Sequence, residues 1–141
     1  LLADIRIAGG NVDAGLSVYR DAMVRFPLHM GLLYGYDGAL IAARRFDDSL
    51  RFSEAQLQNY PDDVRLHKMR AESYAGLGRK AQQHQALAQA FALQGQTAAA
   101  VEQLQLAERA GDANFFELSV IDARLRELKR QLLEETKEKR N

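Results

Sequence analysis

The sequence contains no cysteine and no tryptophan, and only two of its 141 residues are proline. The absence of cysteine excludes disulfide bonds, thiolate nucleophiles and cysteine-ligated zinc. No apolar run approaches the roughly 20 residues that a membrane-spanning helix needs. The 19 basic residues are balanced by 19 acidic residues, so no excess of positive charge is present to bind phosphates. We therefore expect neither a membrane span nor a nucleic-acid partner.

Residues that favour helices are abundant, above all alanine, leucine, glutamine, glutamate and arginine. Their side chains lose little rotamer freedom in a helix, and proline, which would break the helical hydrogen bonds, is scarce. A hydrophobic content of 47% is enough for one continuous core in a chain of this length. The chain opens on Leu1 with no initiator methionine, so we expect it to belong to a longer protein. The composition predicts a single all-α domain.

The sequence repeats itself at a fixed interval. Pro27 and Pro61 each follow an aromatic residue, and they lie 34 residues apart. The same shift aligns many pairs of identical or similar residues: Asp13 with Asp47, Leu16 with Leu50, Val18 with Phe52, Met23 with Leu57 and Leu32 with Leu66. Self-similarity of this kind is typical of repeat architectures, in which each unit packs on the next.

Apolar spacing places helices inside the repeats. Val12, Leu16, Tyr19, Met23 and Phe26 recur at intervals of four and three, which puts them on one helical face. Residues 46–60 repeat this face, and both helices end before a proline, which disfavours helical geometry in the preceding residue. Asp62 and Asp63 can then cap the helix that follows.

A second helix per unit is expected at residues 28–43 and 64–77, joined to its partner by a short turn. Beyond Gly78 the repeat interval halves from 34 to 17 residues, since Phe91 and Gly95 follow Tyr74 and Gly78 at that distance. The helix expected at 80–93 therefore closes one hairpin and opens the next, which a helix at 97–109 completes.

These residues resemble the tetratricopeptide repeat (TPR) family. Gly15, Ser49 and Ala100 occupy its small-residue position, and Pro27 and Pro61 its terminal proline, whereas Gln83 is bulkier than the pattern expects. The resemblance implies a TPR-type right-handed superhelix of stacked antiparallel helix pairs over residues 1–111, with the first unit truncated. It also implies that the domain binds proteins or peptides.

A narrower resemblance rests on residues 71–132, the run AESYAGLGRKAQQHQALAQAFALQGQTAAAVEQLQLAERAGDANFFELSVIDARLRELKRQL. It is similar to the C-terminal repeat region of bacterial zinc metallopeptidases of the beta-barrel assembly-enhancing protease type. The resemblance implies a periplasmic location, an upstream peptidase domain that holds the zinc, and the outer-membrane protein assembly machinery as a partner. No catalytic residue of that family can be carried over to this chain.

The histidines do not form a metal site of the H-E-x-x-H type. No two of His29, His67 and His84 lie four residues apart, and none is followed by glutamate. We predict that His84 is a packed histidine paired with a neighbour, and that His29 and His67 lie at the surface or at helix starts. The serines and paired acids form no nucleophile elbow or acid/base pair. We therefore expect no cofactor and no catalysis in this chain.

A groove for a protein partner is the candidate site. Stacked hairpins expose one helix of each pair along an inner wall. The TPR resemblance places the following residues on that wall: Tyr34, Gly38, Ile41, Arg65, Lys68, Glu72, Gln82, Gln85 and Gln89.

Residues 112–141 are predicted to form an amphipathic capping helix and a polar tail. Leu118, Ile121, Leu125, Leu128 and Leu132 recur at three and four, and a solenoid needs its last apolar face covered. Phe115 and Phe116 are expected to help cover it, and residues 134–141, which carry no apolar side chain, to extend into solvent or fray. The same spacing would allow a coiled-coil dimer.

The sequence thus favours a non-catalytic protein–protein interaction module, the C-terminal repeat domain of a zinc metallopeptidase. The alternative is an oligomerising or structural adapter that associates through the C-terminal heptad helix and is unrelated to a peptidase.

Overall fold

A computed structural model describes residues 2–4 and 10–141 of the chain. The residues of the truncated first unit from 5 to 9 lie outside the described part. The helices that lie wholly within the described residues are α2 Val12–Arg25, α3 Met30–Ala42, α4 Phe46–Asn59, α5 Val64–Gly76, α6 Lys80–Leu93, α7 Thr97–Arg109 and α8 Phe115–Arg140. Over the described ranges no strand occurs. The all-α prediction is confirmed, and α6 and α7 have the predicted bounds.

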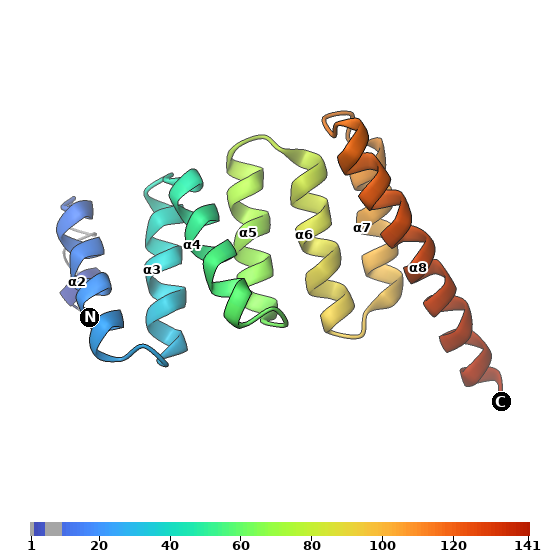
Figure 1. Cartoon of the computed structure of the whole chain (residues 1–141), viewed down its shortest axis with the longest axis horizontal. Helices are drawn as coiled ribbons and strands as arrows, with labels where there is room; N and C mark the ends of the chain where they lie inside the picture. Colours follow the sequence, from blue (N-terminus) through green and yellow to red (C-terminus); the bar gives the residue numbers. More distant parts are fainter. Residues whose placement is uncertain (1, 5–9) are drawn as a thin grey trace.

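Successive helices run in alternating directions and form an elongated array (Figure 1). α3, α5 and α6 follow one another along the long axis, and α4 packs against both α3 and α5. This arrangement is the predicted stack of antiparallel helix pairs, and it is not a closed bundle. No described helix is long and apolar enough to cross a membrane.

The two aromatic–proline seams separate the units as predicted. Phe26 and Tyr60 terminate α2 and α4, and each backbone N–H donates to the carbonyl four residues earlier. The Asp63 carboxylate then accepts a hydrogen bond from the Leu66 N–H at 2.9 Å, which caps α5.

The turns after α3, α5 and α6 are each closed by a backbone hydrogen bond of the same type. The N–H of the residue after the turn donates to a carbonyl five residues earlier, as from Arg79 to Tyr74 at 3.0 Å. Gly78 and Gly95 supply the left-handed backbone that this closure requires, whereas Arg44 adopts it with a φ of 60°. Small residues also matter inside helices, since a Cβ at Gly76 would overlap the Phe46 ring.

α6 is buried on two sides, which confirms its predicted double role. Ala86 packs with Leu50 of α4 and Tyr74 of α5. Ala81 and Ala88 belong to a different cluster, shared with α7 and α8. Alanine is small enough for helices to approach closely on both sides.

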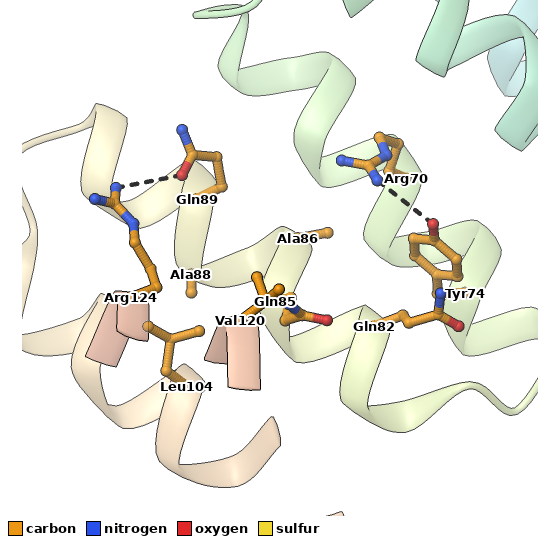
Figure 2. Close-up of a pocket in the computed structure, with 10 residues that line it drawn as sticks. All are labelled: Arg70, Tyr74, Gln82, Gln85, Ala86, Ala88, Gln89, Leu104, Val120 and Arg124. Carbon is orange, nitrogen blue, oxygen red and sulfur yellow. Dashed lines mark hydrogen bonds between the residues drawn. The ribbon is translucent and has the colours of Figure 1, made fainter. Parts of the chain in front are cut away.

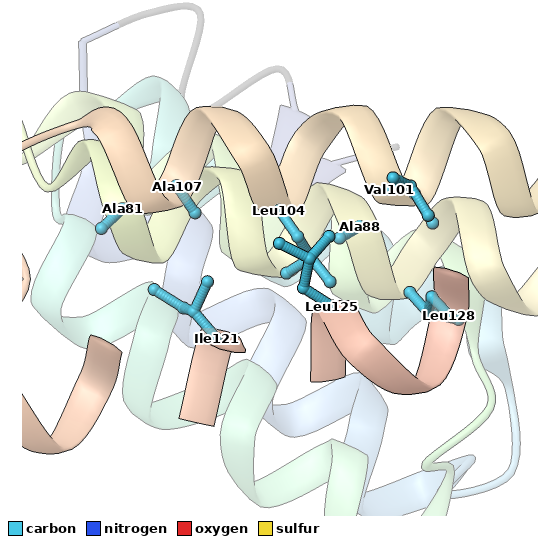
Figure 3. Packing of buried hydrophobic residues seen from close by; sticks show 9 residues of the cluster. Ala81, Ala88, Val101, Leu104, Ala107, Ile121, Leu125 and Leu128 are labelled. Carbon is cyan, nitrogen blue, oxygen red and sulfur yellow. The ribbon is translucent and has the colours of Figure 1, made fainter. Parts of the chain in front are cut away.

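α8 covers the end of the array with part of its predicted stripe (Figure 3). Ile121, Leu125 and Leu128 are buried against α6 and α7, with Leu104 at the centre of the cluster. Because these side chains are covered within the chain, they are not accessible for a coiled-coil dimer.

The prediction that Phe115 and Phe116 help to cover this face is wrong, because they are 87% and 75% exposed. Each helical residue turns by about 100°, so these two rings point roughly 120° and 140° away from Ile121. Of the two expectations for residues 134–141, extension into solvent fits, because α8 continues to Arg140 with mostly exposed side chains and does not fray. The Glu135 carboxylate accepts a hydrogen bond from the buried Thr97 hydroxyl at 2.9 Å, which ties this segment to α7.

A distant carboxylate caps α6, which the sequence did not predict. Arg79, at the N-cap position of α6, makes no side-chain capping bond. Instead Asp112, in the loop after α7, accepts hydrogen bonds from the N–H groups of Lys80 at 2.6 Å and Ala81 at 2.9 Å. The bonds from these N–H groups lower the pKa of Asp112.

Gly76→Ala is expected to destabilise the fold by about 1 to 3 kcal/mol, because the added methyl would overlap the Phe46 ring. Gly38→Ala is the matched control on α3, where the new Cβ would lie 3.7 Å from the Met69 methyl, an ordinary contact. Helix propensity should make Gly38→Ala neutral or stabilising. Urea denaturation followed by circular dichroism measures both, and equal effects would contradict the overlap.

Asp112→Ala is expected to lower the unfolding free energy by about 1 kcal/mol near neutral pH, because two N–H groups lose their cap. The folded pKa lies below the unfolded one, so this stabilisation is present above the ordinary aspartate pKa and is lost as pH falls through the folded value. Denaturation of both proteins across that range tests it. Asp122→Ala, which removes an exposed ion pair with Arg126, is the control and should change little.

Candidate protein-binding cleft

A cleft of about 370 Å³ opens between α5, α6 and α8, with α7 at its base (Figure 2). Its lining combines three glutamines and two arginines with a tyrosine and small apolar side chains. The full set is Arg70, Tyr74, Gln82, Gln85, Ala86, Ala88, Gln89, Leu104, Val120 and Arg124.

The two-sided burial of α6 directs its glutamines into this cleft. At about 100° per residue, Gln82, Gln85 and Gln89 fall between the alanines that face α5 and those that face α7 and α8. All three glutamines are half-buried. The packing of α6 therefore decides which of its polar side chains line the cleft.

Arg70 stands at one end of the cleft, on α5. Its guanidinium lies 5.6 Å from the centre of the Tyr74 ring and donates to the Tyr74 hydroxyl at 3.4 Å. The carboxylate of Glu54 is 3.8 Å away, and the hydroxyl of Tyr74 donates to that carboxylate at 3.3 Å. The Arg70 Nε is buried and makes no hydrogen bond within the described residues.

Arg124 stands at the other end, on α8. One guanidinium nitrogen donates to the Gln89 side-chain oxygen at 3.4 Å, and another to Glu127 at 2.9 Å. Val120, one helical turn earlier, is 45% exposed and supplies an apolar surface at the rim. The cleft can thus offer hydrogen-bond donors, amide groups and a small apolar contact to a partner.

The structure divides the predicted groove residues into groups. Gln82, Gln85 and Gln89 come together in the cleft. Tyr34 and Arg65 contact each other elsewhere. The remaining four do not line the cleft: Gly38 and Ile41 are half-buried on α3, and Lys68 and Glu72 are exposed on α5. A role of these residues in binding stays a prediction.

Tyr34 and Arg65 join α3 to α5. The Arg65 guanidinium lies 4.6 Å from the centre of the Tyr34 ring, an attractive cation–π geometry. The Tyr34 hydroxyl donates to Asp63 at 2.5 Å, and burial together with this bond raises the pKa of Tyr34 to about 12. Tyr34 therefore supports the capping residue of α5, a structural role beside any role in binding.

Sequence reasoning missed Arg70, Tyr74, Val120 and Arg124. The sequence identified Tyr74 only as a repeat position. The i, i+4 spacing of Arg70 and Tyr74 puts them on one side of α5 and could have paired them. Which face of α6 meets α8 cannot be read from the repeat, because α8 lies outside it.

The histidines behave differently from one another. His84 lies 2.8 Å from the Gln103 side-chain oxygen, which confirms the predicted packed histidine. His29 is the exposed N-cap residue of α3, as expected. Of the two positions predicted for His67, the helix start holds, since His67 is the fourth residue of α5, and the surface does not. His67 is 7% exposed, its ring lies 2.8 Å from the Pro61 carbonyl, and burial lowers its pKa. In the described part of the chain, no three His, Asp or Glu side chains are grouped so that they could hold a metal ion.

A buried carboxylate lies between α3, α4 and α5. Asp37 of α3 is fully buried, accepts a hydrogen bond from the Ser49 hydroxyl, and is linked through it to Ser73 at 2.8 Å. Burial raises the pKa of Asp37 to about 6; the Ser49 bond opposes this effect and the charge of Glu72 adds to it. Asp37 is fully buried and does not line the cleft, so a substrate there cannot reach it.

Comparison with solved structures finds a similar chain, the crystal structure of a thermophilic TPR protein of Thermus thermophilus. The two are 18% identical, with 93% of this chain and 79% of that chain covered and a TM-score of 0.44. No protein-family model matches, and neither does any curated protein. The assignment as stacked helical hairpins rests on the packing described above.

The raised pKa of Asp37 predicts a falling stability as pH rises. The folded pKa of about 6 exceeds the unfolded value, so the folded state is favoured while Asp37 is protonated and loses that advantage as pH rises through about 6. Two pKa units correspond to about 3 kcal/mol. The difference in unfolding free energy between the wild type and Asp37→Asn should therefore change by about 2 to 3 kcal/mol from about pH 4 to 7. A constant difference would contradict the raised pKa.

Proposed function

We propose that this chain is a non-catalytic protein–protein interaction module that holds an extended segment of a partner in the cleft between α5, α6 and α8. The observation that carries the proposal is the glutamine row of α6, which lies between two arginines in one cleft. Glutamine side chains can pair with both the N–H and the C=O groups of a peptide backbone. A rigid helical array holds these groups in place, which reduces the entropy lost on binding.

A more specific context is proposed from the resemblance of residues 71–132. The chain would be the repeat domain of a periplasmic zinc metallopeptidase, with the zinc held by the peptidase domain, and would engage the outer-membrane protein assembly machinery or substrates. The support for this context is the sequence resemblance alone. The cleft serves the same purpose in an adapter without a peptidase.

The alternative, an oligomerising module, requires that the apolar stripe of α8 be accessible to a second copy. The centre of the apolar stripe that would pair two copies, Ile121, Leu125 and Leu128, is buried against α6 and α7, and only Leu118 at its start is 37% exposed. Binding of another protein through the cleft is therefore the function that the geometry favours.

Selection of a random peptide library on the immobilised chain tests the proposal. Enriched peptides should bind the wild type in calorimetry, and Gln85→Ala should weaken binding by about fivefold, the effect of losing one to two hydrogen bonds. Gln83→Ala is the matched control, because Gln83 lies on the same helix outside the cleft. No enrichment, or equal binding by the Gln85 variant and the wild type, would reject the cleft as the binding site.

A further inference from the structure

The lining of the cleft is cationic. It contains Arg70 and Arg124 and no acidic side chain. Figure 2 shows the two arginines at opposite ends, with Gln85 and Val120 between them. A partner that enters the cleft therefore meets a positive group at each end and an apolar contact in the middle.

Neither arginine is firmly neutralised by the protein itself. The nearest carboxylate to Arg70, that of Glu54, lies at 3.8 Å, and the Arg70 Nε has no hydrogen-bond partner within the described residues. Arg124 pairs with Glu127, whose side chain is 58% exposed. Exposed ion pairs contribute little to stability, so a carboxylate of a partner can replace them at small cost.

The middle of the cleft fits a peptide backbone and one apolar side chain. Gln82 and Gln85 make no side-chain hydrogen bond within the described part of the chain, so their amides are available to a partner. Val120 is 45% exposed, and Phe116, one turn earlier on the same face of α8, is 75% exposed. The apolar surface thus continues from the cleft along α8.

We propose that the cleft recognises an extended acidic segment of a partner protein, in which an apolar side chain lies between two carboxylate side chains. One carboxylate pairs with Arg70 and the other with Arg124, while the apolar side chain contacts Val120 and Phe116. Gln82 and Gln85 pair with the backbone between them. This inference rests on the proposed function and adds the chemistry of the partner.

Fluorescence anisotropy of short labelled peptides on the whole chain tests the inference. The probe is acetylated and amidated, and carries a leucine between two glutamates in an otherwise Gly/Ser sequence. Replacing both glutamates by glutamine should weaken binding by about tenfold or more, since charge-assisted hydrogen bonds are lost. Arg124→Gln should remove most of the preference for the acidic peptide, and added salt should reduce it in the wild type.

Arg126→Gln is the matched control on α8, because Arg126 lies outside the cleft and pairs with Asp122 at the surface; it should keep the preference. Equal binding of the acidic and amide peptides would overturn the inference. So would binding that requires a free C-terminal carboxylate, tested with the non-amidated peptide. If library selection yields cleft-dependent peptides that are not acidic, only the inference fails, whereas absence of any peptide binder rejects the proposed function as well.

Discussion

Burial of α6 on two sides is the constraint on which the C-terminal half of the molecule depends. Its alanines allow α5 to approach on one side and α7 with α8 on the other. Apolar contacts of this kind supply most of the stability of a helical array, because an amphipathic helix gains little from its own hydrogen bonds. The remaining face of α6 carries glutamines, so the packing that stabilises the array also forms the cleft.

The N-terminal half also has an apolar cluster, around Leu16 and Leu40, and adds a buried polar network to it. Asp37, Ser49 and Ser73 are fully buried and connect α3, α4 and α5 through hydrogen bonds. Small polar residues keep the helix crossings close, but the buried carboxylate costs stability when it is charged.

Much of the fold could be predicted from the sequence, and less of the site. The aromatic–proline seams, the bounds of α6 and α7 and the double role of α6 followed from periodicity and turn residues, which are local properties. The exposure of Phe115 and Phe116 could not be predicted in this way, because it depends on the rotation of α8 about its axis. Arg70 and Arg124 lie far apart in the sequence and meet one cleft only because α6 holds α5 and α8 together. Asp112 was missed for the same reason, since its bonding partners lie about 30 residues earlier in the chain.

The bond from Asp112 to the start of α6 also bears on the order in which the chain becomes structured. During synthesis, the first turn of α6 leaves the ribosome well before the carboxylate that completes it. That turn therefore cannot reach its final form until α7 has folded back beside α6. The last three helices should accordingly gain and lose structure as one cooperative unit, rather than one hairpin at a time.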